Sequence, residues 1–187
     1  HSPAYYYRGL LKRYLKQYEE PIKDFDMAVL IDGKAEYAFC ARGVAKHSIG
    51  EFREAVKDFD KAIQLNCEYE FAYVKRGVAK CELEEYEEAI EDFNKAIEID
   101  KEYDYAYAQR GRAKLELERY EEAIEDFSKA IELYKEYAYS YVQRGRAKLE
   151  LERYEEAVED FSKAIEIDKE YDYACVQRGR AKCELKE

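Results

Sequence analysis

The sequence predicts an all-α solenoid built from helical hairpins, and three observations support this class. The dipeptide Arg-Gly recurs at a fixed spacing of 34 residues, from Arg8-Gly9 to Arg178-Gly179. Apolar and small residues within each period follow spacings of three and four, which is typical of amphipathic helices. The alternation and the β-branched enrichment of strands are missing. A period of this length indicates a stack of similar supersecondary units.

Residues 104–137 show how one period folds. The apolar or small residues of its first half are Ala106, Tyr107, Gly111, Ala113, Leu115 and Leu117. Those of its second half are Tyr120, Ala123, Ile124, Phe127, Ala130, Ile131 and Leu133. One continuous helix from Tyr105 to Leu133 is an alternative, but the apolar stripe shifts phase near residues 117–120 and favours two antiparallel helices. Neither helix can bury its stripe alone, so neighbouring units must stack.

The repeated glycine lies inside the expected first helix, where Gly costs about 1 kcal/mol relative to Ala. At Gly111 and its equivalents we expect the partner helix to pack against backbone that lacks a Cβ. Ala123 and Ala130 would allow the same close approach from the other side. No phosphate-binding loop pattern surrounds this glycine, which disfavours a catalytic use.

The pattern resembles the tetratricopeptide repeat (TPR) family, whose 34-residue unit has Gly at position 8, Ala at 20 and 27, and an aromatic residue at 24. With Asp104 as position 1, these places hold Gly111, Ala123, Ala130 and Phe127. The resemblance implies a right-handed superhelical solenoid, with one array over residues 1–187. Its repeats are 2–35, 36–69, 70–103, 104–137, 138–171 and a final single helix at 172–187.

The chain departs from the family pattern at several positions. The terminal Pro of the repeat is missing, and the turn between the two helices keeps Gly only at Gly50. Glu84, Glu118 and Glu152 hold that place in later repeats, where a positive φ would suit Gly far better than Glu. Pro21 replaces the first Ala in repeat 2–35, and it should fit because the first turn of a helix tolerates Pro.

Position 7, usually Leu in the family, is Arg in all six copies. An Asp recurs in phase with it, at Asp24, Asp58, Asp92, Asp126 and Asp160. The planar guanidinium can hold a carboxylate through two hydrogen bonds. We therefore expect a ladder of structural ion pairs rather than a ligand site.

The resemblance also implies a concave groove that is lined by the first helices and holds peptide or protein partners. Positions 2, 6 and 9 of the last three first helices give the candidate partner-binding residues Tyr105, Gln109, Arg112, Tyr139, Gln143, Arg146, Tyr173, Gln177 and Arg180. Gln amides can pair with a peptide backbone, Arg can hold carboxylates, and Tyr offers rigid amphipathic area. An equally weighted alternative is a surface without a ligand. In that case Glu116, Glu150 and Glu184 neutralise the arginines from four residues away, and the tyrosines pack between helices.

Some family members hold the carboxy-terminal tail of heat-shock chaperones with a clamp that needs Lys at position 5. This chain has Cys40, Val74, Ala108, Val142 and Val176 there. We therefore do not expect the chaperone clamp.

Composition excludes several other functions. The net charge of −11 argues against binding of nucleic acid. The sequence contains no run of 18 apolar residues, so we expect no membrane-spanning segment. Five widely spaced Cys and two His support neither a metal site nor a redox motif. We therefore expect no cofactor and no enzyme activity. We expect the cysteines to be free thiols in a reducing cytosol. We interpret His47 as a sequence variant at a surface or half-buried position. The only Met is Met27, so we expect an excised piece or a processed product.

These observations lead to one functional hypothesis and one alternative. The chain is expected to be a cytoplasmic protein-interaction scaffold that binds a protein or an extended peptide in the concave groove. In the alternative it is a structural module that self-associates end to end, because near-identical units leave the two ends of the array complementary.

Overall fold

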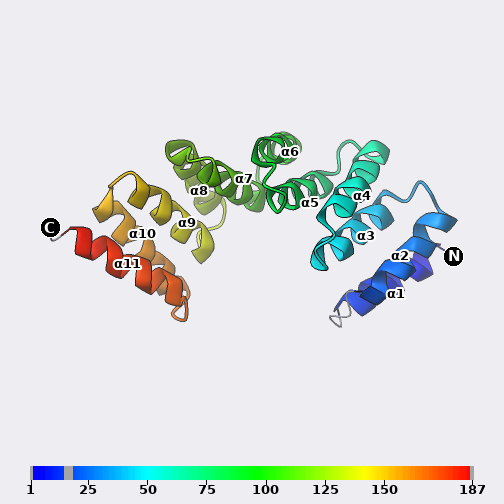
Figure 1. Ribbon diagram of the computed structural model, residues 1–187, viewed down its shortest axis with the longest axis horizontal. Coiled ribbons are helices and arrows are strands. Elements are labelled where there is room, and N and C mark those ends of the chain that lie inside the picture. The colour runs from blue at the N-terminus through cyan, green and yellow to red at the C-terminus, as the bar shows by residue number, and fades with distance from the viewer. Residues whose placement is uncertain (1, 15–18, 186–187) are drawn as a thin grey trace. The chain divides into compact units, whose positions relative to one another are not determined.

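The computed structural model describes residues 2–14 and 19–185, and these residues form α-helices without any strand (Figure 1). Helices α1, α3, α5, α7, α9 and α11 are the first helices of successive repeats, and the even-numbered ones are the second helices. Their bounds are α1 Ser2–Tyr14, α2 Glu19–Ile31, α3 Glu36–Ser48, α4 Phe52–Leu65, α5 Glu70–Cys81, α6 Tyr86–Ile99, α7 Asp104–Glu116, α8 Tyr120–Leu133, α9 Ala138–Glu150, α10 Tyr154–Ile167 and α11 Asp172–Glu184. The predicted break near residues 117–120 is confirmed.

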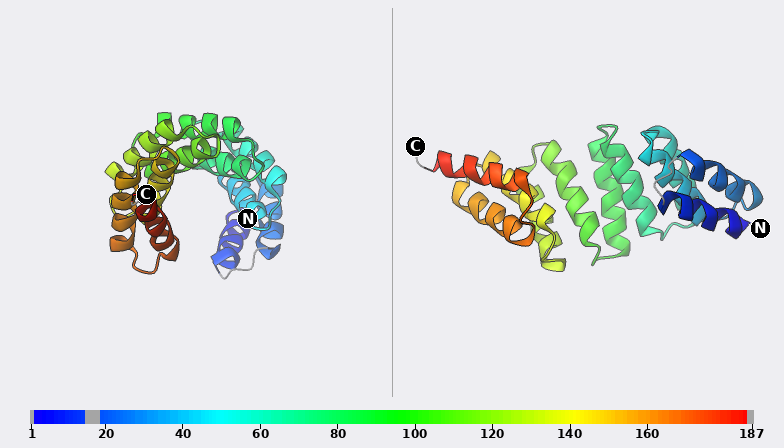
Figure 2. Two further views of the ribbon diagram at one scale, coloured as in Figure 1. Left: turned by 60° about the vertical axis from the view of Figure 1, so that its left-hand side comes forward. Right: turned by 90° about the horizontal axis from the view of Figure 1, so that it is seen from below.

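The helices form two compact units, His1–Asp100 and Lys101–Glu187. Within each unit every helix packs against its successor, as Figure 2 shows from two further sides. First helices also contact each other, α1 with α3 and α3 with α5 in one unit, α7 with α9 and α9 with α11 in the other. Within the described part of either unit, no such contact joins the second helices. The first helices therefore form the inner layer of each unit and the second helices its outer layer.

A phenylalanine ring fills the space beside the glycine in each complete repeat. The five rings, Phe25, Phe59, Phe93, Phe127 and Phe161, are fully buried. A Cβ placed on Gly145 would lie 2.9 Å from Cε1 of Phe161, and the corresponding separations at Gly9 and Gly43 are 2.6 and 2.7 Å. The expected close approach is confirmed, and a side-chain ring rather than helix backbone makes it. Gly179 in α11 differs, because no atom lies within 4 Å of its Cβ position.

The turn between the two helices of a repeat holds a residue in the left-handed region. Gly50 has φ 82°, whereas Glu84, Glu118 and Glu152 have φ 61°, 59° and 58°. The turn is closed by hydrogen bonds from the amide of Glu118 to the carbonyl of Leu115 at 3.0 Å, and from Arg119 to Lys114 at 2.9 Å. These bonds hold the glutamates in a conformation that costs roughly 1–2 kcal/mol for an L-residue. Pro21, the third residue of α2, is fully buried in the first turn as expected.

The predicted arginine–aspartate ladder joins the two helices of every complete repeat. In α9, Arg144 donates from Nε to Asp160 Oδ2 at 3.0 Å and from Nη2 to Oδ1 at 2.6 Å. The equivalent pairs are Arg8–Asp24, Arg42–Asp58, Arg76–Asp92 and Arg110–Asp126. The carboxylates are buried, and two hydrogen bonds hold each pair. The arginine side chain is mostly buried in four of the pairs, whereas that of Arg8 is 56% exposed.

A lysine that the sequence analysis did not place also binds this aspartate. Lys148 Nζ lies 2.9 Å from Asp160 Oδ2, and Lys46, Lys80 and Lys114 make the same contact at 2.8–2.9 Å. Each of these four buried carboxylates therefore has two cationic partners, both supplied by the first helix. Removing the aspartate would leave two partly buried cations without their anion, which is the costly way to break such a network.

The same arginines connect consecutive repeats. Arg42 Nη1 donates to Asp26 of α2 at 2.7 Å, and Arg76 Nη1 donates to Asp60 of α4 at 2.6 Å. Arg144 makes the corresponding bond to Ser128 Oγ of α8 at 3.0 Å. Each of these guanidiniums thus ties its own first helix to two second helices, which accounts for Arg at position 7 as a structural residue.

We predict that Gly145→Ala lowers the free energy of unfolding by about 1–3 kcal/mol, because the added methyl overpacks against Phe161. The matched control is Gly179→Ala, in the same helical context without a facing ring, which should stabilise the chain by up to ~1 kcal/mol. Urea unfolding followed by circular dichroism measures both. Equal effects of the two substitutions would contradict the packing role of the glycine.

We predict that Glu118→Gly stabilises the chain by ~1 kcal/mol, since Gly adopts a positive φ without the strain of a Cβ. Gly50→Ala should have the opposite effect at the equivalent place. Thermal unfolding of both variants tests the pair. A lower melting temperature for Glu118→Gly would show that the glutamate side chain stabilises the turn by more than its backbone strain costs.

Candidate functional site

The nine residues predicted to bind a partner all lie in the second unit. Each of α7, α9 and α11 carries one tyrosine, one glutamine and one arginine of the set. Because α9 contacts both α7 and α11, the structure brings the three triplets to consecutive first helices. They belong to the inner layer and are not part of the arginine–aspartate ladder that joins first and second helices.

The glutamines are less accessible than the sequence suggested. Gln109 and Gln143 are only 6% and 8% exposed, whereas Gln177 is half-buried. Arg146 Nη1 donates to Gln143 Oε1 at 2.7 Å. Gln143 thus positions the arginine and is not itself open to a peptide backbone.

Arg146 does not form the helical pair that would neutralise it in the alternative interpretation. It donates to Gln143 and makes no ion pair with Glu150 within the described residues. Arg180 is exposed, and Arg112 and Arg146 are half-buried. The charge of Arg146 therefore stays available on this face.

An arginine of α7 or α9 acts on a tyrosine near the start of the next first helix. Burial raises the pKa of Tyr139 to about 12, while the positive charge of Arg112 acts in the opposite direction. Burial likewise raises the pKa of Tyr171, and Arg146 opposes that rise. A guanidinium that influences the hydroxyl 25–27 residues further on lies at the junction between two first helices. We call the set Arg112, Tyr139, Arg146 and Tyr171 the tyrosine–arginine face.

Two tyrosines of this junction were not among the predicted residues. The ring of Tyr137 stacks on Tyr134, with ring centroids 6.2 Å apart, and is tilted against Tyr139 at 5.5 Å. Burial raises the pKa of Tyr137 to about 12. Tyr171 holds the same repeat place, which also recurs as Tyr69 and Tyr103. The recurrence of tyrosine every 34 residues could have indicated this position. The sequence analysis missed it because the position lies before the first helix and outside the family's usual groove positions.

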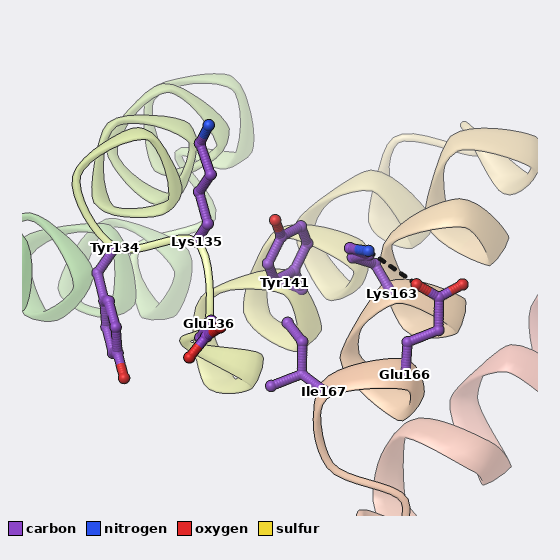
Figure 3. Close-up of a pocket in the computed structure, with 7 residues that line it drawn as sticks. All are labelled: Tyr134, Lys135, Glu136, Tyr141, Lys163, Glu166 and Ile167. Atoms are coloured by element: carbon purple, nitrogen blue, oxygen red, sulfur yellow. Dashed lines mark hydrogen bonds and ion pairs between the residues drawn. The ribbon is translucent and has the colours of Figure 1, made fainter.

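A hollow in the second unit lies elsewhere, beside the turn between α8 and α9. It has a volume of about 680 Å³, and Figure 3 shows the residues that line it: Tyr134, Lys135, Glu136, Tyr141, Lys163, Glu166 and Ile167. Lys163 and Glu166 pair across 2.7 Å, so charge in the hollow is largely balanced. A hollow of about 600 Å³ in the first unit uses the same repeat positions, with Lys95 and Glu98 paired. The repetition indicates a consequence of repeat geometry rather than a dedicated site.

Position 5 of the first helices does not offer the contact that a chaperone clamp needs. Cys40, Val74, Ala108 and Val142 are buried and cannot contact a ligand. Only Val176 of this set, in α11, is exposed.

The remaining candidate groups are isolated. His47 is half-buried, as expected, and packs edge-on against Phe52 with 5.1 Å between ring centroids. Burial lowers its pKa.

In the described part of the chain no cluster of three His, Cys, Asp or Glu could hold a metal ion, and no disulfide joins the cysteines. None of the described helices is both long enough and apolar enough to cross a bilayer.

Comparison with known proteins identifies the repeat. One tetratricopeptide repeat model matches residues 68–136 and 104–170, and a second matches residues 37–66. No curated protein matches the sequence.

Several solved structures share the fold. MamA superposes with a TM-score of 0.79 at 23% identity, covering 92% of this chain and 94% of its own. YrrB, described as a TPR protein with an unusual peptide-binding site, gives 0.76 at 22% identity, covering 94% and 90%. A thermophilic TPR protein of Thermus thermophilus, TTC0263, gives 0.77 at 17% identity, covering 97% and 98%.

We predict that Tyr139→Phe reduces the loss of stability at alkaline pH. The folded-state pKa of Tyr139, about 12, lies above its ordinary value of 10.0. The stabilisation from the neutral hydroxyl is therefore complete below pH 10 and is lost as the pH rises toward 12. Urea unfolding between these pH values should show a shallower fall for the variant than for the parent chain. Tyr173→Phe, at an exposed tyrosine, is the control, and equal profiles for both variants would contradict the burial of Tyr139.

Proposed function

Because the chain belongs to the tetratricopeptide repeat family, we propose that it is a protein-interaction scaffold that binds an extended segment of a partner on the inner layer of its second unit. The family membership and the peptide-binding site named for YrrB support the scaffold role. The observation that carries the location is the tyrosine–arginine face. There Arg146 pairs with no carboxylate of the described residues, and its charge acts on the half-buried Tyr171.

The proposed contacts follow from the chemistry of these side chains. Arg112, Arg146 and Arg180 would receive carboxylates of the partner, since guanidinium–carboxylate bonds are strong when partly desolvated. Tyr105, Tyr139 and Tyr173 would supply flat amphipathic area. Gln109, Gln143 and Gln177 would act mainly beneath the arginines, as Gln143 does for Arg146. The partner segment is accordingly acidic, with carboxylates spaced to meet successive repeats.

We further propose that the protein acts by binding, without a cofactor, and in the cytoplasm. Family membership supports the non-catalytic role. The exposed thiols of Cys67, Cys175 and Cys183 suit a reducing compartment.

End-to-end self-association remains a second candidate, favoured by apolar side chains that are exposed at the terminal elements. Tyr7, Leu11 and Leu30 of the first hairpin are 59–76% exposed, and Val176 of α11 is 66% exposed. Light scattering over a concentration series tests this candidate. A molecular mass that stays monomeric at high concentration would remove it.

We predict that replacing Arg112, Arg146 and Arg180 together by Ala weakens capture of protein partners at least ~10-fold, because each charge-assisted bond contributes about 1.5–3 kcal/mol. Pull-down followed by mass spectrometry identifies the partners, and titration of one partner gives the affinity. The matched control replaces Lys129, Lys163 and Lys169 by Ala, which removes the same charge outside the inner layer. Unchanged capture by the arginine variant would refute the location of the site.

A further inference from the structure

Tyr134 departs from the repeat at a position that other repeats use to stabilise the turn after the second helix. Its equivalents are Asp32, Asn66, Asp100 and Asp168. The side chains of Asn66 and Asp168 each accept a hydrogen bond at 3.0 Å from the backbone amide two residues further on. A tyrosine cannot close such a turn, because its only polar side-chain atom lies at the far end of the ring. The chain therefore places an aromatic ring here at the expense of a local hydrogen bond.

The ring of Tyr134 is accessible and has no cation over its face. It is 49% exposed and packs on Tyr137 on one side only, and among the described residues no arginine or lysine lies over it. The tyrosines at position 4 of the first helices differ in this respect. The guanidinium carbon of Arg144 lies 5.6 Å from the ring centroid of Tyr141, and the same contact recurs in α5 and α7.

An acidic side chain lies on the same side of the turn as this ring. The backbone of Tyr134 is extended, with φ −137° and ψ 95°, so successive side chains alternate between the two sides. Figure 3 shows the Tyr134 ring and the Glu136 carboxylate on one side of the turn and Lys135 on the other. Glu136 forms no ion pair with any residue that the structure describes. The turn thus offers an aromatic face and an available carboxylate.

The hollow that these residues line recurs with the repeat, but the pair of side chains does not. In the hollow of the first unit Glu68 holds the place of Glu136. Asn66 holds the place of Tyr134, does not line that hollow, and accepts the turn hydrogen bond instead. Repeat geometry therefore supplies the space, and the ring is specific to the turn between α8 and α9.

We propose that Tyr134 and Glu136 form a binding site for an arginine side chain of a partner protein. The guanidinium stacks on the exposed face of the ring and donates hydrogen bonds to the carboxylate, because its planar, charged fork can make both contacts at once. The chain holds its own Arg144 in this way, between the ring of Tyr141 and the carboxylate of Asp160. The net charge of −11 favours the approach of a basic segment.

This site differs from the tyrosine–arginine face in charge and in place. The face offers guanidiniums to an acidic segment, whereas Tyr134 and Glu136 offer a ring and a carboxylate to a basic one. They belong to the turn between α8 and α9, and α10 of the outer layer also lines their hollow. The arginine site therefore does not depend on the proposed groove.

The test titrates the isotope-labelled full chain with N-acetyl-arginine methylamide. Nuclear magnetic resonance follows the backbone amide of Glu136 and the ring of Tyr134. We expect saturable shifts with a Kd on the order of 10 mM, since one stacked cation and one exposed charge pair bind weakly. N-acetyl-citrulline methylamide has the same shape without the charge and should bind at least ~5-fold more weakly.

Variants of the chain locate the binding. Tyr134→Asn copies Asn66 and should abolish the shifts at Glu136, while the melting temperature stays equal or rises because the turn regains its hydrogen bond. Glu136→Gln should weaken binding ~3-fold. The matched control Lys135→Gln changes the opposite side of the turn and should not weaken binding.

A gain of function tests whether the ring is sufficient. Asn66→Tyr places a tyrosine two residues before Glu68 in the first unit, beside the hollow that lacks one. It should create a second site with a similar Kd, read from the amide of Glu68. Circular dichroism verifies that each variant is folded.

Several results would overturn the proposal. One is the absence of saturable shifts with the arginine probe, and another is equal binding of the citrulline analogue. Binding that survives Tyr134→Asn, or a lower melting temperature of that variant, would make the ring purely structural. A dimer of the parent chain that Tyr134→Asn converts to monomer would assign the site to a second copy. The triple variant at Arg112, Arg146 and Arg180 should bind the probe normally, so failure of the proposed groove and failure of this site are separable.

Discussion

The contact between a phenylalanine ring and a glycine sets the separation of the two helices in every complete repeat. The ring of Phe161 occupies the volume that any side chain at residue 145 would need, so the ring packs directly against the backbone of the first helix. The alanines around it, Ala157 and Ala164, are fully buried for the same reason. The helix propensity lost at the glycine, about 1 kcal/mol, is offset by burial of an entire aromatic side chain. The arginine–aspartate pair beside it joins the same two helices.

The position of an arginine relative to the glycine determines which side of the first helix it occupies. The arginine just before the glycine points toward the second helix and is bound by a buried aspartate, as Arg144 is by Asp160. The arginine just after the glycine lies on the inner layer, where Arg146 meets Gln143 and influences Tyr171. Two adjacent guanidiniums, separated by one residue, therefore have opposite roles because the helix turns them to opposite sides.

Sequence periodicity predicted the architecture well, because a 34-residue recurrence constrains every repeat at once. It placed the break between α7 and α8, the partner of Arg144 and the strained turn at Glu118, since each depends on residue type at a repeated position. It did not place Lys148 on Asp160, because a lysine that recurs on a helix gives no sign of whether it is exposed or buried. The burial of Gln143 and the stacking of Tyr137 depend on how consecutive hairpins are rotated against each other, which no single repeat encodes. The hollow beside Tyr141 is formed by a turn and two helices, so no local motif marks it.

The bond from each ladder arginine to the preceding repeat has a consequence for stiffness. In the first unit the acceptors are Asp26 and Asp60, both more than half exposed, whereas Arg144 in the second unit donates to the uncharged Ser128. Dissolved ions weaken exposed charge pairs but scarcely affect a bond to a neutral hydroxyl. We therefore expect added salt to weaken the contacts of α3 with α2 and of α5 with α4 more than the contact of α9 with α8.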